Sequence, residues 1–322
     1  MHLALRFMLG LLCAVMTQTS VWSQEWPVHP VHIIVPGPPG GSPDRVTRLV
    51  ANGLSEIWGQ PVVVENKPGA STRIAAGFVV KAPADGYTLL STFGTHTALK
   101  ALFSDLNFDP IADFTAVARF VRTENVFVVN ASSPYKTLRE LTDAYKTSGL
   151  PLEYGHLGKG SAYHVWGMLL GRHAGIKMIP ISYKGEALEM QDILGQHLKS
   201  GFNSMGTALP QIHAGLLRGL AVVAPSRSKV LPDVPTFAEL GYPDLDHAGW
   251  LGMVARAKTP RPILEKINAD VAKVLAEPKV ANNLNNQGFV PDPATVNVFT
   301  RQLVEEGPMW ERLFHDFGIK PQ

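Results

Sequence analysis

The sequence predicts an α/β protein made of two α/β units. Short strand-like and helix-like segments alternate along most of the 322-residue chain, which is typical of parallel sheets covered by helices. The strand-like segments are β-branched and almost continuously apolar, as strands buried on both faces are. The length of the chain favours about two domains over a single small core.

The first unit opens with a βαβ motif. Apolar runs at 31–35 and 61–66 flank the segment 43–58, in which apolar residues recur at helical spacing until Gly59 ends it. A third apolar run follows at 87–92. Because a helix joins neighbouring strands of one sheet in parallel, we expect the strands of this motif to be parallel.

The pattern recurs after residue 125 and predicts the second unit. Expected strands lie at 125–130, 152–156, 178–183, 198–203 and 219–224, and expected helices at 137–147, 161–173, 187–195 and 208–215. We expect the apolar segment 250–257 and the amphipathic helix 261–277 to return to the first unit. The predicted domains are therefore residues 24–124 with 226–322, and residues 125–225.

Residues 1–23 have the features of a secretory signal peptide. Arg6 precedes an apolar run at 7–16, and the small residue Ser23 ends a sequence suited to cleavage. The alternative is a membrane anchor, but about ten apolar residues are fewer than the ~20 that a spanning helix needs. We expect cleavage after Ser23 and a location in the periplasm. Cys13, the only cysteine in the sequence, would be lost with the signal, leaving no disulfide and no cysteine metal site.

Composition excludes some classes of partner and catalyst. The formal net charge is only +2, with 29 basic and 27 acidic residues and no basic run, so we expect no nucleic-acid partner. The same architecture hosts enzymes, but the chain has neither a G-x-S-x-G nor an H-E-x-x-H motif. We therefore expect no enzymatic activity, and an α/β enzyme is the less favoured alternative. We also expect a monomer without cofactor or metal.

The stretch PGPPGGSPD at 36–44 places bare backbone between a strand and a helix. Ser42 suits the N-cap position, Pro43 the first helical position and Asp44 the first turn. Free N–H groups at the positive start of a helix favour anions. The stretch matches neither nucleotide-binding glycine motif, and the alternative is that its glycines only permit a turn with positive φ. The expected ligand contacts here are Pro39, Gly40, Gly41, Ser42 and Asp44.

Two further turns repeat this arrangement. The stretch YGHLGKGSAYH at 154–164 puts glycines and a capping serine between strand and helix in the second unit, and STFGTHTA at 91–98 follows a strand in the first. Two glycine-rich helix starts, one per unit, can face each other across a cleft. Lys159 can pair with a ligand carboxylate or be solvated in its turn, and the histidines can be ligands or packing residues. The expected contacts are Thr95, His96, Gly158, Lys159, Gly160, Ser161 and His164.

Several motifs together resemble a known family. In chain order the sequence contains IIVPGPPGGSPD, GQPVVVENKPGA, KAPADGYTLL, GTHTA, YKGEA, ALPQIHAGLLRGLAVV and VLPDVPTFAELGYP. This succession resembles the tripartite tricarboxylate transporter substrate-binding proteins, the TctC or Bug family. The resemblance implies a type II periplasmic binding protein fold, in which two α/β domains flank a ligand cleft. It also implies capture of a small organic carboxylate and its delivery to the membrane permease subunits of such a transporter.

The resemblance also suggests which residues hold the ligand. In the family, backbone and hydroxyl groups of the first strand–helix turn bind the carboxylate with ordered waters, and glycine-serine turns of the second domain complete the site. These groups match Gly40, Gly41 and Ser42 on one side and Gly158, Gly160 and Ser161 on the other. Tyr183 and Asn203 complete the expected contacts.

The chain departs from the family pattern at several positions. Gly37 stands where an aromatic residue is frequent, Lys159 and Tyr163 are bulky for the second turn, and Asn203 stands where many members carry an acid. Because asparagine offers no counter-charge for an ammonium group, we expect an organic acid without an amino group, such as a dicarboxylate or an aromatic acid. The alternative is that Asn203 only packs at a strand end. A sensory protein that signals to a membrane receptor fits the same features.

Overall fold

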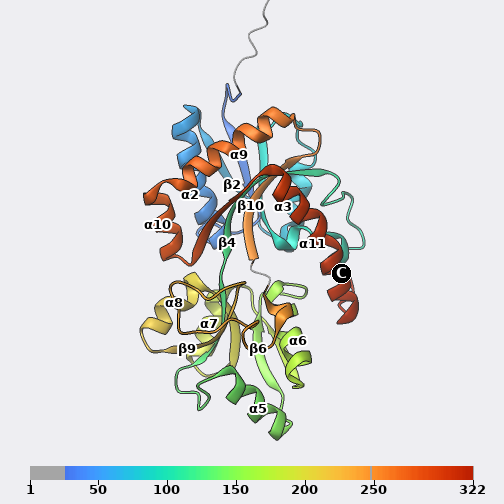
Figure 1. The fold of residues 1–322 in the computed structure, drawn as a ribbon. Helices are drawn as coiled ribbons and strands as arrows, with labels where there is room; N and C mark the ends of the chain where they lie inside the picture. The colour runs from blue at the N-terminus through green and yellow to red at the C-terminus, as the bar shows by residue number, and fades with distance from the viewer. Residues whose placement is uncertain (1–25, 247–248, 322) are drawn as a thin grey trace, which may run out of the picture.

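The computed structural model describes residues 26–246 and 249–321. Two separate sheets, of six and five strands, each carry helices and form two lobes placed end to end (Figure 1). The predicted α/β class with two units is therefore confirmed. The predicted signal peptide, residues 1–23, lies outside the described residues. No helix within the described ranges is long and apolar enough to cross a membrane.

The first sheet has the strand order β11-β4-β10-β3-β1-β2. Strand β1 pairs in parallel with β2 and β3, as the βαβ motif predicts. Strand β10 pairs with β3 and β4, so the segment expected to return to the first unit does so, but in antiparallel orientation. The strands are β1 (Val31–Val35), β2 (Val62–Asn66), β3 (Thr88–Phe93), β4 (Phe114–Thr123), β10 (Gly249–Arg256) and β11 (Phe289–Ala294).

Helices cover both faces of the first sheet. Successive side chains of a strand point to opposite faces, and Ile33 accordingly packs with residues of α2, α9 and α10, whereas Ile34 packs with residues of α3, α4 and α11. Both residues are fully buried. The helices are α2 (Ser42–Trp58), α3 (Arg73–Val79), α4 (Leu99–Leu102), α9 (Arg261–Ala276), α10 (Pro278–Asn286) and α11 (Val296–Asp316), with short 3₁₀ turns η1 (Ala70–Thr72) and η2 (Gly94–His96).

The second sheet has the strand order β7-β6-β8-β5-β9. Strand β6 is parallel to β7 and β8, while β5 is antiparallel to β8 and β9. Its strands are β5 (Asn125–Asn130), β6 (Leu152–His156), β7 (Met178–Ser182), β8 (Ser200–Ser204) and β9 (Leu217–Val223). Its helices are α5 (Leu138–Ser148), α6 (Ala162–Ala174), α7 (Glu186–Leu194) and α8 (Met205–His213), and the 3₁₀ turn η3 (Pro243–Leu245) lies beside α6.

Within the described residues the chain passes from the first lobe to the second through Glu124, between β4 and β5. After β9 the chain stays with the second lobe, because Phe237 N–H donates to the backbone oxygen of Val222 at 3.1 Å and its ring packs on Phe202. The domain boundaries expected at 124 and 225 stay predictions. We propose that the first boundary lies at residue 124 and the second close to residue 246, because η3 still packs against α6 of the second lobe.

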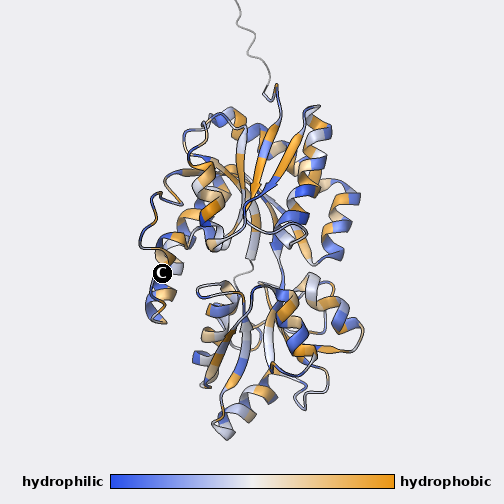
Figure 2. Ribbon diagram, turned by 180° about the vertical axis from the view of Figure 1, so that it is seen from behind, coloured by the Kyte–Doolittle hydropathy of each residue, from blue (hydrophilic) through white to orange (hydrophobic). Residues whose placement is uncertain are grey.

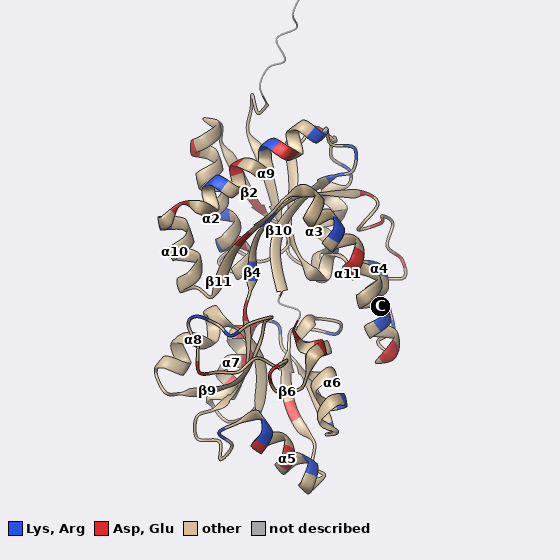
Figure 3. Ribbon diagram, viewed as in Figure 1, with Lys and Arg blue, Asp and Glu red and all other residues tan. Residues whose placement is uncertain are grey.

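Hydropathy and charge are distributed as in a protein with two buried sheets. In Figure 2 several strands of the first lobe are largely orange, whereas the strands of the second lobe and the helices are mixed in colour. In Figure 3, basic and acidic residues are interspersed over the two lobes. The view therefore shows no extended field of one sign, in keeping with the net charge of +2.

Candidate ligand cleft

A cavity of about 1150 Å³ lies between the lobes and takes its walls from both. Several wall residues follow the carboxyl ends of parallel strands: Pro36 follows β1, Gly94 follows β3, Leu157 follows β6, and Lys184 comes shortly after β7. Open α/β sheets bind ligands at this edge, because the connections there supply helix starts and free backbone groups.

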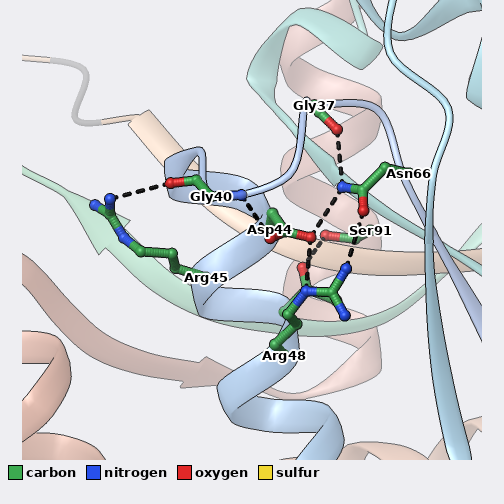
Figure 4. Close-up of polar contacts among 8 residues, drawn as sticks. Gly37, Gly40, Asp44, Arg45, Arg48, Asn66 and Ser91 are labelled. Carbon is green, nitrogen blue, oxygen red and sulfur yellow. Dashed lines mark hydrogen bonds and ion pairs between the residues drawn. The ribbon is translucent and has the colours of Figure 1, made fainter. Parts of the chain in front are cut away.

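The first glycine turn is held together by its own aspartate (Figure 4). Gly40 N–H donates to Asp44 Oδ2 at 2.8 Å, and Gly41 N–H donates to the backbone oxygen of Pro38 at 3.2 Å. Asp44 also accepts from Arg48 Nε at 3.0 Å and Asn66 Nδ2 at 2.9 Å. Burial alone would raise the pKa of Asp44, but these bonds from Arg48, Gly40 and Asn66 outweigh it and hold the pKa below its usual range. The glycine N–H groups expected to bind an anion thus have partners within the turn.

Of the residues in this turn that were expected to contact the ligand, Ser42 lines the cavity. It is the first helical residue of α2 and not the N-cap, which is Gly41, and no side chain caps this helix. Pro36, Gly37 and Pro38 line the cavity beside Ser42. Pro39, Gly40, Gly41 and Asp44 do not line it.

The second glycine turn is satisfied in the same way, by histidines. Gly158 N–H donates to His156 Nδ1 at 3.1 Å and Gly160 N–H to His164 Nδ1 at 3.2 Å. A ring nitrogen that accepts a bond is unprotonated. In keeping with that, burial lowers the pKa of His156, and burial, His156 and Lys159 lower the pKa of His164 to about 4. These histidines therefore shape the turn as neutral acceptors.

Of the residues in the second turn that were expected to contact the ligand, Ser161 lines the cavity. It caps α6, as predicted, by accepting a bond from His164 N–H at 3.3 Å. Lys159 Nζ instead donates to the backbone oxygen of Lys320 at 3.1 Å, which links the turn to the C-terminal segment. Gly158, Lys159, Gly160 and His164 do not line the cavity.

The remaining expected contacts divide between the wall and the layer behind it. Thr95 lines the cavity, whereas His96 is fully buried, with Nε2 2.9 Å from the backbone oxygen of Pro110, and burial lowers its pKa to about 4. Tyr183 donates to Asp192 Oδ2 at 2.7 Å, and Asn203 is fully buried; neither lines the cavity. The structure thus gathers Ser42, Thr95 and Ser161 around one space, and whether they contact a ligand stays a prediction.

One polar cluster in the cavity wall, around Glu186, was not expected from the sequence. Glu186 begins α7 and accepts bonds from Ser204 Oγ and Thr207 Oγ1, both at 2.6 Å, and from Tyr163 OH at 2.5 Å. Tyr163 OH also lies 2.9 Å from Asn125 Oδ1. Burial and the nearby Glu186 raise the pKa of Tyr163 well above its usual value. An acid placed directly after Gly185, at a helix start behind a strand, is the signal that could have identified Glu186.

The first lobe contributes a second carboxyl group to the wall. Trp250 Nε1 lies 2.9 Å from both carboxyl oxygens of Glu306, and Gln302 Nε2 donates to Glu306 Oε1 at 2.7 Å. Burial raises the pKa of Glu306 to about 7, despite the bonds from Gln302 and Trp250. Arg119 and Arg122, also in the wall, are both paired with Asp292, at 2.7 and 2.9 Å.

A family model described as the tripartite tricarboxylate transporter family receptor, TctC, matches residues 46–319. The chain belongs to this family. Among its TctC-type relatives, BugT of Bordetella pertussis is 30% identical, over 93% of this chain and 93% of its own length.

Solved structures agree with the TctC assignment. An R. palustris protein determined with adipate is 31% identical, with a TM-score of 0.83, and the match covers 92% of this chain and 100% of that one. MatC from Rhodopseudomonas palustris with bound malate is 30% identical, with a TM-score of 0.78, over 89% and 99% of the two chains. The type II periplasmic binding protein fold expected from the resemblance is thereby confirmed.

Proposed function

We propose that this TctC-family protein captures a small organic carboxylate in the cavity between its lobes and delivers it to the membrane permease of a tripartite tricarboxylate transporter. The observation that supports this most strongly is the cavity, which lies at the carboxyl ends of strands from both sheets and is lined by Ser42, Thr95 and Ser161 among other residues. Relatives of the same fold have been determined with adipate and with malate. The role is binding, without a chemical step.

The proposed capture joins the two lobes. Ser42 and Thr95 belong to the first lobe and Ser161 to the second, so one carboxylate that takes bonds from both sides links them. Hydroxyl donors to a carboxylate form bonds stronger than those between neutral groups. Ligand binding is therefore expected to favour a closed arrangement of the lobes.

Export completes the proposal. The run at 7–16 and the small residue Ser23 lead us to propose removal of residues 1–23 and a location in the periplasm. Mass spectrometry of protein made in its own host should find an N-terminus near Gln24. Intact residues 1–23 on a cytosolic protein would contradict this part of the proposal.

A binding screen tests the capture step. Purified protein is titrated with mono-, di- and tricarboxylates, aromatic acids included, by thermal shift and calorimetry. A ligand present at about 100 times its dissociation constant should stabilise the fold by about 2.7 kcal/mol. Small-angle scattering should show compaction with the same ligand. Absence of any shift across the whole series would contradict carboxylate capture.

An uptake assay tests delivery. Cells lacking the gene should lose uptake of the labelled acid, and the wild-type gene should restore it. The control for the level of expression is a variant of the protein that binds the acid normally in vitro and is produced in the same deletion strain. Unimpaired uptake in the deletion strain would contradict a transport role while leaving carboxylate binding intact.

A further inference from the structure

The polar groups of the second-lobe wall bind a carboxylate of the protein itself, the side chain of Glu186. Glu186 Oε2 accepts from Ser204 Oγ and Thr207 Oγ1, and Glu186 Oε1 accepts from Tyr163 OH and, at 3.3 Å, from Ser204 N–H. The three hydroxyl bonds, at 2.5 to 2.6 Å, have the short lengths of charge-assisted hydrogen bonds. Three hydroxyl groups of the second lobe, those of Tyr163, Ser204 and Thr207, therefore point at Glu186 and not at a ligand carboxylate.

The surroundings of Glu186 disfavour a second negative charge. Glu189 lies one turn further along α7, is fully buried, and has its pKa raised to about 9 by burial and by Glu186. A ligand carboxylate placed here would meet Glu186 directly, and like charges at close range repel. Lys184, two residues earlier, also lines the cavity and offers a cation to a ligand carboxylate placed further from Glu186.

Tyr163 can make room for a donor on the ligand. Its hydroxyl has one proton and two acceptors within reach, Glu186 Oε1 at 2.5 Å and Asn125 Oδ1 at 2.9 Å. When the proton points to Asn125, Glu186 Oε1 loses the bond from Tyr163, and the Tyr163 oxygen becomes an acceptor beside it. Both residues line the cavity, so an ammonium, amide or hydroxyl group of the ligand can donate to this pair of oxygens in place of the lost bond, and an ammonium group also gains the charge interaction with Glu186.

We propose that Glu186 determines specificity at the second-lobe end of the cleft: it accepts a donor group of the ligand, an ammonium group best, and rejects a second carboxylate. The ligand class is then an organic acid that carries an amino or other donor group. This inference rests on the proposed capture of a carboxylate. The sequence argument against an amino group rested on Asn203, which is fully buried and donates to Glu189 Oε1 at 3.3 Å. An acidic side chain is absent at position 203, and Glu186 supplies one in the cavity wall.

Matched ligands test the inference by calorimetry. Adipate, 6-aminohexanoate and hexanoate share a chain length and differ in one end group, as do succinate, 4-aminobutanoate and butanoate. Wild-type protein should bind the amino acid of at least one set about tenfold or more tighter than the diacid. Glu186→Gln should lower that ratio about tenfold or more, because it removes the charge and adds an amide donor. Glu56→Gln, at an exposed position of α2, is the control for the change in net charge.

Each outcome separates the inference from the function on which it rests. If the diacid binds wild type as tightly as its amino partner in both sets, or if Glu186→Gln keeps the wild-type ratio while still binding, Glu186 has no such role and carboxylate capture stands. If no acid binds wild type, both proposals are wrong. Should Glu186→Gln fail to fold, the wild-type ranking alone decides, and Tyr163→Phe, which keeps Glu186 but removes its hydroxyl donor, should preserve the preference for the amino acid.

Discussion

Gly160 of the second lobe packs directly against Leu102 of the first. A β-carbon at residue 160 would lie 2.3 Å from Leu102 Cδ2 and 3.5 Å from Phe314 Cζ. Gly160 also has a φ of +78°, which residues with side chains rarely adopt. The second glycine turn is therefore an inter-lobe contact as well as the support of Ser161.

Gly160→Ala should destabilise the protein by about 2–5 kcal/mol: about 1–2 kcal/mol for a side chain at positive φ, and about 1–3 kcal/mol because the added methyl group has to displace Leu102. Gly40→Ala is a matched control, since Gly40 has the same φ of +78° but no atom within 4 Å of the added carbon. That control should lose only the backbone term of about 1–2 kcal/mol. Urea unfolding measures both. Equal losses would mean that the contact with Leu102 yields without strain.

Periodicity was sufficient to predict the first-lobe βαβ motif and most of the second lobe. The parallel pairing of β1 with β2 follows from a helix between two buried strands, and the structure has it. The antiparallel direction of β5 and β10 did not follow from the sequence, because an apolar strand has the same composition in either direction. The packing of Phe237 on the second lobe was missed for a related reason: a loop residue carries no periodic signal.

The site was predictable at its helix starts and less so elsewhere. Ser42 and Ser161 reach the cavity because each begins a helix behind a strand, and sequence spacing shows such places. The glycine N–H groups are occupied by Asp44, His156 and His164, which local hydrogen bonds decide and spacing does not. The bonds that Glu186 accepts from Ser204 depend on the start of α7 lying against the end of β8, which is a property of the folded lobe and not of the local sequence.

Ser42→Ala should weaken binding of the captured acid about tenfold, which corresponds to about 1.4 kcal/mol. It should change the stability of the protein little, because Ser42 makes no capping bond. Ser161→Ala should weaken binding and also cost about 1 kcal/mol of stability through loss of the α6 cap. Tyr183→Phe, which removes a hydroxyl outside the cavity, should leave affinity within about twofold. Calorimetry and urea unfolding check these; a larger affinity loss for Tyr183→Phe than for Ser42→Ala would reverse the assignment.

Glu189 should make stability depend on pH. Burial and Glu186 raise its pKa in the folded protein to about 9 from 4.5. Between about pH 5 and pH 9 the folded chain keeps a proton that the unfolded chain has released, so stability falls as pH rises through this window. Glu189→Gln stays neutral, and its stability relative to wild type should grow from pH 5 to pH 9 and then level off. Urea unfolding at several pH values, with Glu56→Gln as the exposed control, measures the difference; a constant difference would contradict the raised pKa.

Trp250→Phe should cost about 1–3 kcal/mol, because it removes the indole donor from Glu306 and leaves Gln302 as that carboxyl's remaining hydrogen-bond donor among the described residues. Burial raises the pKa of Glu306 to about 7, so its carboxyl group is largely protonated at pH 5 and largely ionised at pH 8. The ionised form depends more on a donor, and the cost should therefore be larger at pH 8 than at pH 5. Trp310→Phe is the matched control, since the Trp310 indole nitrogen is buried without a hydrogen-bond partner among the described residues. Urea unfolding of both variants at the two pH values decides: equal and pH-independent losses would show that Trp250 acts through packing alone and not through its bond to Glu306.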